Sequence, residues 1–87
     1  MKHSTLPRFW DAYRLLPKDV RALADKSFER LKIDPHHPLL QLKKVGRTRH
    51  LWSARVGAHY RALGTEKPEG ILWFWIGPHS EYDTLLG

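Results

Sequence analysis

The chain has 87 residues, and 15 Lys and Arg against 9 Asp and Glu give it a formal net charge of +6 at pH 7. This length predicts one domain (1–87) with a small core, and the charge indicates a partly anionic partner. Cysteine is absent, which excludes disulfides and thiolate metal sites. No stretch resembles a secretion signal or the roughly 18 apolar residues of a membrane span, so we expect a soluble cytoplasmic protein.

Two helices are predicted in the first part of the chain. Apolar residues at positions 9, 10, 13 and 16 predict a short helix, with Pro7 tolerated in its first turn. A second helix should begin at Pro17 and carry apolar residues at 20, 23, 24, 28 and 31. It should end before Asp34, because Pro35 disfavours helical backbone in the residue before it. The segment 1–6 shows no alternation, and no strand is expected there.

After Pro38 the apolar period changes from 3.6 to 2. Strands are predicted at 39–45, 50–56, 58–64 and 70–76, with connections short enough for hairpins. The fold class is therefore α+β, with two N-terminal helices packed on a three- to four-stranded antiparallel sheet. The turn after Val56 leaves one question open. A two-residue turn would place Ala54 opposite Arg61, whereas a bulge would bring Arg55 opposite it.

Four stretches of the sequence, taken in their order along the chain, can be compared with known families. They are the two-helix start, DPHHPLLQLKKV, LWSARVGAHYRAL, and an apolar strand that ends in IGPHSEYDTLL. Trp52, Ser53 and Arg55 precede Arg61, and His79 supplies a terminal basic residue. This ordered set, over residues 7–86, resembles the RelE/ParE superfamily of toxins from toxin–antitoxin systems. The RNA-cutting branches of the RelE, YoeB and YafQ type are the most similar in style.

The resemblance implies a RelE-like fold and a metal-independent endoribonuclease without cofactors. Such an enzyme is called an mRNA interferase and is a hydrolase. It cuts messenger RNA on the ribosome and thereby inhibits translation, and a cognate antitoxin inhibits it. The expected partners are thus an antitoxin and ribosome-bound mRNA, with no membrane and no metal. Two alternatives stay open. The ParE branch inhibits DNA gyrase by protein binding on the same scaffold, and a non-catalytic RNA-binding module would share the basic surface.

Metal-free RNA cleavage needs a proton removed from the 2′-hydroxyl, a stabilised phosphorane and a protonated 5′ oxygen. The guanidinium of arginine suits the phosphorane, because it stays charged and its fork matches phosphate oxygens. The resemblance makes Arg61 the catalytic arginine, and Arg55 either a second one or a structural anchor. His79 stands where relatives carry a terminal His or Arg. Because a free imidazole has a pKa of about 6.5, histidine can give or accept a proton near neutral pH, so this residue is either the general acid or an exposed turn histidine.

Tyr82 is the fourth candidate catalytic residue. It could stack on a base or donate its hydroxyl to phosphate, or it could pack back onto the helices. At least one of Trp73 and Trp75 should lie in the core, because the strand alternates. Leu51 and Ser53 stand where one RNA-cutting branch has catalytic lysines, and Leu40 stands where another has a glutamate proposed as base, so no obvious general base is present. Either His79 takes that role, or the arginines and the geometry of the ribosome-bound RNA carry most of the effect.

Four basic residues surround the first predicted hairpin. They could follow an RNA backbone, or they could form a solvated charged face. These RNA-binding candidates are Lys43, Lys44, Arg47 and Arg49. The histidines outside this region show no paired spacing with carboxylates, so no metal site is predicted.

Overall fold

The structure, a computed structural model, describes residues 2–46 and 50–86. Its helices are α1 (Pro7–Arg14), α2 (Lys18–Ile33) and α3 (His79–Leu86), with a short 3-10 helix, η1 (Pro38–Leu40). Its strands are β1 (Lys2–Thr5), β2 (Lys43–Val45), β3 (Leu51–Val56), β4 (Tyr60–Lys67) and β5 (Gly70–Pro78). Within these ranges, no helix is long and apolar enough to cross a bilayer.

The strands form one mixed sheet in the order β1-β5-β4-β3-β2. β2 to β5 make the predicted antiparallel meander, whereas β1 lies parallel to β5. The α+β prediction is confirmed, but the three- to four-stranded antiparallel sheet is wrong. The missed strand, KHST, has no apolar alternation because it is an edge strand. Its pairing comes from β5, where Lys2 lies opposite Gly70 and Thr5 opposite Trp73.

The first two helices form where the sequence predicts them. Pro7 occupies the start of α1, where its missing N–H and fixed φ are tolerated. In α2, Asp19 lies in the first turn, and Arg30 and Lys32 lie in the last turn. Both placements complement the helix dipole.

The predicted strand at 39–45 is only partly correct. Residues Pro38–Leu40 form η1, since proline suits the start of a helical turn, and strand structure is confined to Lys43–Val45. Between the two elements, Gln41 has a left-handed backbone with φ 44°. The other three strands lie where expected, with boundaries shifted by a few residues.

One face of the sheet is covered by α1 and α2 and contains the main core. We call it the helix-covered face. Its buried apolar residues are Phe9, Leu16, Val20, Ala24, Leu31, Leu40, Ala54, Val56, Ala62, Ile71, Trp73 and Ile76. Trp73 is 2% exposed, which confirms a core tryptophan. A bulge between Leu63 and Gly64 shifts the register against β5, so Trp73 and Ile76 are both buried although they are three residues apart.

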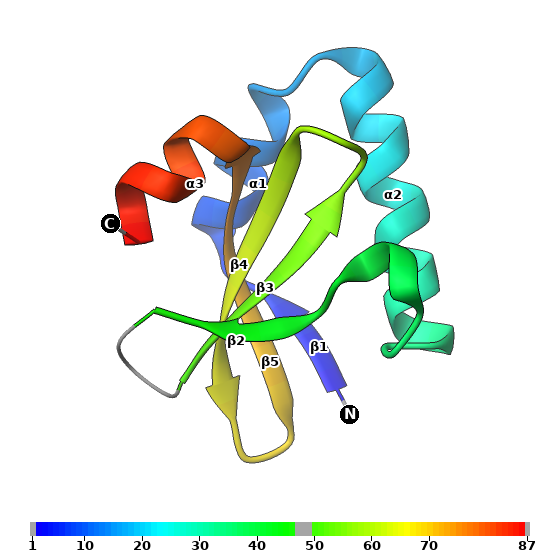
Figure 1. The fold of residues 1–87 in the computed structure, drawn as a ribbon, viewed down its shortest axis with the longest axis vertical. Helices are drawn as coiled ribbons and strands as arrows, with labels where there is room; N and C mark the ends of the chain where they lie inside the picture. The colour runs from blue at the N-terminus through cyan, green and yellow to red at the C-terminus, as the bar shows by residue number, and fades with distance from the viewer. Residues whose placement is uncertain (1, 47–49, 87) are drawn as a thin grey trace.

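The chain ends in a helix that the sequence does not predict. His79 is the first residue of α3, directly after β5. Figure 1 shows α2 and α3 on opposite sides of the strands. α3 contacts β4 and β5, and at its far end Leu86 lies beside Gly46. We call the sheet surface under this helix the α3 face.

Candidate functional site

Strand pairing between β3 and β4 answers the question that the turn left open. Arg55 lies directly opposite Arg61, because Val56 pairs with Tyr60 across a three-residue connection. Gly57 enables this connection, since its φ of 60° is left-handed. Residues that face each other across a ladder share a side of the sheet, and so do alternate residues of a strand. Ser53, Arg55 and Arg61 therefore rise from the α3 face.

Arg61 is buried on this face, with 7% of its surface exposed. Its Nη2 donates a hydrogen bond to Oε1 of Gln41 at 2.8 Å, and its Nη1 donates to Oγ of Ser53 at 3.4 Å. Its Cζ lies 5.5 Å from the ring centroid of Tyr82, which is within cation–π range. The guanidinium is thus held from three sides by neutral groups.

The charge of Arg61 has no counterion in the part of the chain that the structure describes, because the ion pairs there involve other residues. Its Nε is also buried without a hydrogen-bond partner in those residues. Buried charges are usually paired, since removing an ion from water is costly. A buried cation with only neutral neighbours is therefore well suited to bind an anion that arrives from outside.

Gln41 holds Arg61 from a strained backbone position. Its φ and ψ are both 44°, in the left-handed region that residues other than glycine rarely adopt. Such a conformation costs on the order of 1–3 kcal/mol, and it is often found at functional sites. Here it joins η1 to β2 and places the side-chain amide within reach of Arg61.

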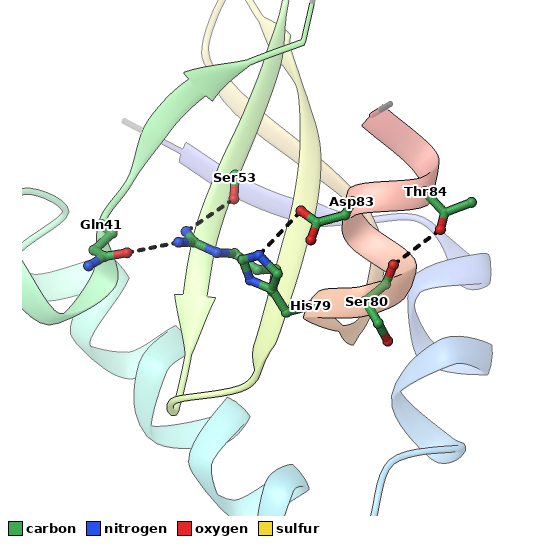
Figure 2. A network of polar contacts seen from close by, with 7 residues as sticks. Gln41, Ser53, His79, Ser80, Asp83 and Thr84 are labelled. Carbon is green, nitrogen blue, oxygen red and sulfur yellow. Dashed lines mark hydrogen bonds and ion pairs between the residues drawn. The ribbon is translucent and has the colours of Figure 1, made fainter.

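His79 and Asp83 form a pair at the start of α3. Nε2 of His79 lies 3.2 Å from Oδ1 of Asp83, one helical turn later, as Figure 2 shows. This contact leaves Nδ1 of the imidazole available to exchange a proton. The ring of His79 lies 5.3 Å from the ring of Tyr82, centroid to centroid. Tyr82 therefore contacts both His79 and Arg61, and it is itself 6% exposed.

For Tyr82 the sequence left two possibilities open, a contact with RNA or packing onto the N-terminal helices. In the structure its ring lies against the guanidinium of Arg61 of β4. The reason is that α3, which the sequence did not indicate, carries Tyr82 back across the strands. The hydroxyl of Tyr82 makes none of the side-chain hydrogen bonds found within residues 2–46 and 50–86.

Arg55 rises from the same face as Arg61, but its head group lies elsewhere. Its Nε donates to the backbone oxygen of Gly57 at 2.9 Å, and its side chain lines a hollow beside α2 with Leu23 and Arg30. This is possible because β2 pairs only with residues 51–53 of β3, so the edge of β3 is open at Arg55. The structure thus brings together Arg61, Tyr82 and His79, and it separates Arg55 from them.

The two described lysines of the first hairpin lie on different faces. Lys43 pairs with Ser53 and therefore shares the face of Arg61, and it is exposed. Lys44 pairs with Trp52 on the other face, where its Nζ contacts Glu66 at 3.2 Å. The hydrogen bond from the Trp52 indole, followed by Lys44, lowers the pKa of Glu66. Arg47 and Arg49 lie outside the described residues.

Sequence reasoning missed Gln41 and Asp83, and it treated Ser53 as a departure from the family pattern. The spacing of four between His79 and Asp83 could have revealed their contact once α3 was assumed. Gln41 has no comparable local signal, because its role depends on the turn between η1 and β2. Across residues 2–46 and 50–86, no group of three or more His, Asp or Glu could hold a metal ion.

Chemically, the site offers a fixed cation, an aromatic ring and an imidazole with one free nitrogen. Arg61 can bind and stabilise an oxyanion, and His79 can give or accept a proton beside it. Asp83 can fix the orientation and tautomer of the imidazole, as carboxylates do for catalytic histidines. This set is suited to reactions of a phosphodiester.

Comparison with known proteins gives a consistent result. A family model described as ParE-like toxin domain matches residues 18–84. No curated protein sequence matches the chain. Among solved structures, similar folds occur in two toxins that were crystallised with their antitoxins. The RelB–RelE complex of Methanococcus jannaschii gives a TM-score of 0.74 at 15% identity, covering 97% of this chain and 99% of that one.

The second complex is RelE–RelB of Pyrococcus horikoshii OT3, with a TM-score of 0.66, 20% identity and coverage of 88% and 92% of the two chains. The YoeB/ParE toxin of Agrobacterium tumefaciens gives a TM-score of 0.67 at 18% identity, with coverage of 91% and 99%. At these identities the likeness concerns the fold, which is the RelE-like fold that the sequence predicted.

Proposed function

Because the chain belongs to the ParE-like toxin domain family and is a RelE/ParE superfamily toxin, we propose that it cuts messenger RNA on the ribosome and thereby inhibits translation. The observation that carries the proposal is Arg61, a guanidinium that is 7% exposed and held by Gln41, Ser53 and the Tyr82 ring. Among the described residues it has no acidic partner. A phosphate of the RNA would supply the missing negative charge.

Each neighbouring residue has a proposed part in the reaction. Arg61 binds the scissile phosphate and stabilises the phosphorane, a contribution of the kind that is worth about 10²–10³ in rate. His79 protonates the leaving 5′ oxygen through Nδ1, and Asp83 is a positioning residue that holds Nε2. The ring of Tyr82 packs against both Arg61 and His79, and its hydroxyl can reach the RNA.

The RNA backbone should follow the basic edge of the α3 face. Lys43 is exposed on this face, and Arg47 and Arg49 follow it in the sequence. Lys44 contributes less, since its ammonium group already contacts Glu66. We keep Arg55 as a candidate second arginine only if RNA binding draws its head group away from Gly57, to which it is hydrogen-bonded.

The 2′-hydroxyl must also lose its proton, but no carboxylate pairs with Arg61 in the described residues, and Asp83 contacts His79. The ribosome would then supply part of the catalysis by holding the RNA with its 2′-oxygen in line for attack, because correct orientation alone lowers a barrier by several kcal/mol. With Nδ1 of His79 acting as the acid, the proton of the 2′-hydroxyl passes to solvent water as the 2′-oxygen attacks. A target on the ribosome would place the protein in the cytoplasm.

The direct test incubates the purified protein with ribosomes and a short mRNA and maps the 5′ ends of the products. We expect discrete cuts, lost by about 10²–10³-fold in Arg61→Ala and by about 10²–10⁴-fold in His79→Ala. Arg14→Ala and His36→Ala are matched controls, because both side chains lie on exposed surfaces away from the site. Full cutting by both Arg61→Ala and His79→Ala would refute the proposal.

Inhibition of DNA gyrase by protein binding is the second candidate, favoured by the ParE-like family model and by the lack of a carboxylate base beside Arg61. A supercoiling assay with purified gyrase separates the two. Loss of supercoiling without any mRNA cutting would establish this alternative. RNA binding without cutting or gyrase inhibition would instead indicate a non-catalytic RNA-binding module.

We further propose a cognate antitoxin as partner. The similar toxins of Methanococcus jannaschii and Pyrococcus horikoshii OT3 are found in complexes with RelB. An acidic or amphipathic antitoxin segment could cover the basic surface at Lys43 or displace the end of α3. Co-expression with a neighbouring small reading frame should then abolish growth arrest.

A further inference from the structure

A second histidine, His59, lies beside the start of α3. It is the last residue of the turn between β3 and β4, directly before Tyr60. The backbone N–H of His79 donates a hydrogen bond to the backbone oxygen of His59 at 2.8 Å. Figure 1 shows this turn and the start of α3 at the same end of the sheet. The fold thus brings together two histidines that are far apart in the sequence.

The pairing of β4 with β5 fixes the side of the sheet on which His59 lies. Tyr60 pairs with Pro78, and the next step of this register places His59 opposite His79. Their backbone hydrogen bond continues the ladder by that step. Tyr60 packs against the core of the helix-covered face. Because side chains alternate along a strand, His59 shares the α3 face with Arg61.

The imidazole of His59 is available to a ligand. The residue is exposed, and its side chain makes none of the hydrogen bonds or ion pairs found within residues 2–46 and 50–86. Opposed residues of two antiparallel strands have their Cβ atoms about 4.5–5.5 Å apart, and alternate residues of one strand are about 6–7 Å apart. A phosphodiester bound to Arg61 would therefore lie within reach of both imidazoles.

RNA cleavage by the 2′-hydroxyl needs two proton transfers. The attacking 2′-oxygen and the leaving 5′-oxygen lie on opposite sides of the phosphorus atom, and one must lose a proton while the other gains one. His79 alone cannot do both in one step, since its Nε2 contacts Asp83 and only Nδ1 remains for exchange. Imidazole is a much stronger base than water, and a positioned base contributes about 10²–10⁴ in rate. A second imidazole beside Arg61 would supply the missing base.

We propose that His59 is a catalytic residue that takes the proton of the 2′-hydroxyl before this proton passes to solvent. The inference rests on the proposed function. The neutral imidazole of His59 accepts the proton, and the electron pair left on the 2′-oxygen forms the bond to phosphorus. As the bond from phosphorus to the 5′-oxygen breaks, Nδ1 of the protonated His79 donates its proton to that oxygen. The products are a 2′,3′-cyclic phosphate and a 5′-hydroxyl, and proton exchange with water resets both imidazoles.

An exposed histidine in a turn could instead bind a phosphate as a cation. The two roles predict opposite effects of pH, because a base works only when neutral and a cation only when protonated. The charged groups on the elements around His59 are Arg55 and Arg61 on the strands and Glu81 and Asp83 on α3. Arginine and acidic side chains ordinarily titrate outside pH 5–8. Changes of cutting rate within that range therefore report the two histidines.

The test measures kcat/KM for cutting of ribosome-bound mRNA between about pH 6 and 8.5, the range in which histidine changes its charge. His59→Ala should lower it by about 10²–10⁴-fold at neutral pH. It should also remove the fall of activity on the acidic side, whereas His79→Ala should remove the fall on the alkaline side. Added imidazole should restore part of the cutting by His59→Ala, because position 59 is exposed. The ratio of variant to wild type at each pH removes any effect of pH on the ribosome itself.

Two further variants serve as controls. His59→Lys keeps a cation and should be as inactive as His59→Ala, and His36→Ala, at another exposed position, should keep the wild-type profile. Circular dichroism and thermal melting check that each variant is folded, and His59→Asn replaces His59→Ala if the latter unfolds.

Full cutting by a folded His59→Ala, with the wild-type pH profile, would overturn the inference and leave the proposed function intact. Wild-type activity in His59→Lys would also overturn it and would make His59 a phosphate contact. If the wild-type protein does not cut, the proposed function and this inference are refuted together.

Discussion

The two faces of the central sheet use the same strands for different ends. Ala54 lies opposite Ala62 on the helix-covered face, and one step along each strand Arg55 lies opposite Arg61 on the α3 face. The first pair is buried among apolar residues, whereas the second holds two cations. Because side chains alternate along a strand, one register fixes both faces. The helix-covered face stabilises the fold, and the α3 face carries the charged site.

The largest expected effect is a loss of stability when the core of the helix-covered face is disrupted. Trp73→Ala should lower the free energy of unfolding by about 3–5 kcal/mol, since it leaves a large cavity beside Ile71 and Ile76. Urea denaturation followed by circular dichroism measures the change. Trp10→Ala is the matched control, because Trp10 is 39% exposed and should cost less. Equal losses in the two variants would contradict this division of the sheet.

The next effect separates stability from activity on the α3 face. Arg61→Met keeps the length of the side chain and removes its charge, so the free energy of unfolding should stay the same or rise by about 1–4 kcal/mol. Cutting of ribosome-bound mRNA should nevertheless fall by about 10²–10³-fold. Denaturation and the cleavage assay are run on one preparation. A marked loss of stability would mean that Arg61 serves the fold.

A smaller effect tests the bulge at Leu63 and Gly64 in the pairing of β4 with β5. A Cβ added at Gly64 would collide with Cγ2 of Ile71 and would lie 2.9 Å from the Trp73 ring. Gly64→Ala should therefore lower the free energy of unfolding by about 1–3 kcal/mol, through overpacking against the core. Thermal unfolding gives the change. An unaltered melting temperature would show that β4 can move away from β5 here.

The sequence predicts most of the helix-covered face and much less of the other. Periodicity locates α2 and the strands because it is a local property, and it also predicts a buried tryptophan in β5. The strand at Lys2–Thr5 escapes detection, since its four residues have no apolar pattern and pair only because β5 has a free edge. Whether Arg55 or Ala54 lies opposite Arg61 depends on the length of the turn between β3 and β4, which composition does not determine.

The candidate site shows the same limit. Arg61 and His79 are predictions drawn from family resemblance, and their roles await the cleavage assay. Gln41 reaches Arg61 only through its left-handed backbone, so no motif in the sequence indicates the contact. Asp83 is different, since its spacing from His79 is visible once α3 is known. Residues joined by tertiary contacts are thus harder to predict than residues joined along a helix.

The smallest effect concerns His3, which brings a titratable group to the helix-covered face. The Trp73 indole donates to its Nδ1 at 3.1 Å, and its Nε2 is buried with no partner in the described residues. Burial lowers the pKa of His3 below its ordinary value of 6.5. The unfolded chain therefore binds more protons below pH 6.5, so this contribution is complete above 6.5 and is lost as pH falls toward the folded pKa.

Replacing His3 should consequently flatten the pH dependence of stability between about pH 7 and 5. In His3→Asn, the slope of unfolding free energy against pH should fall by at most about 1.4 kcal/mol per pH unit, the value for one proton. Urea denaturation at several pH values provides the slopes, and His36→Asn, at an exposed position, should leave them unchanged. An identical slope in wild type and His3→Asn would mean that β1 separates from β5 before His3 is protonated.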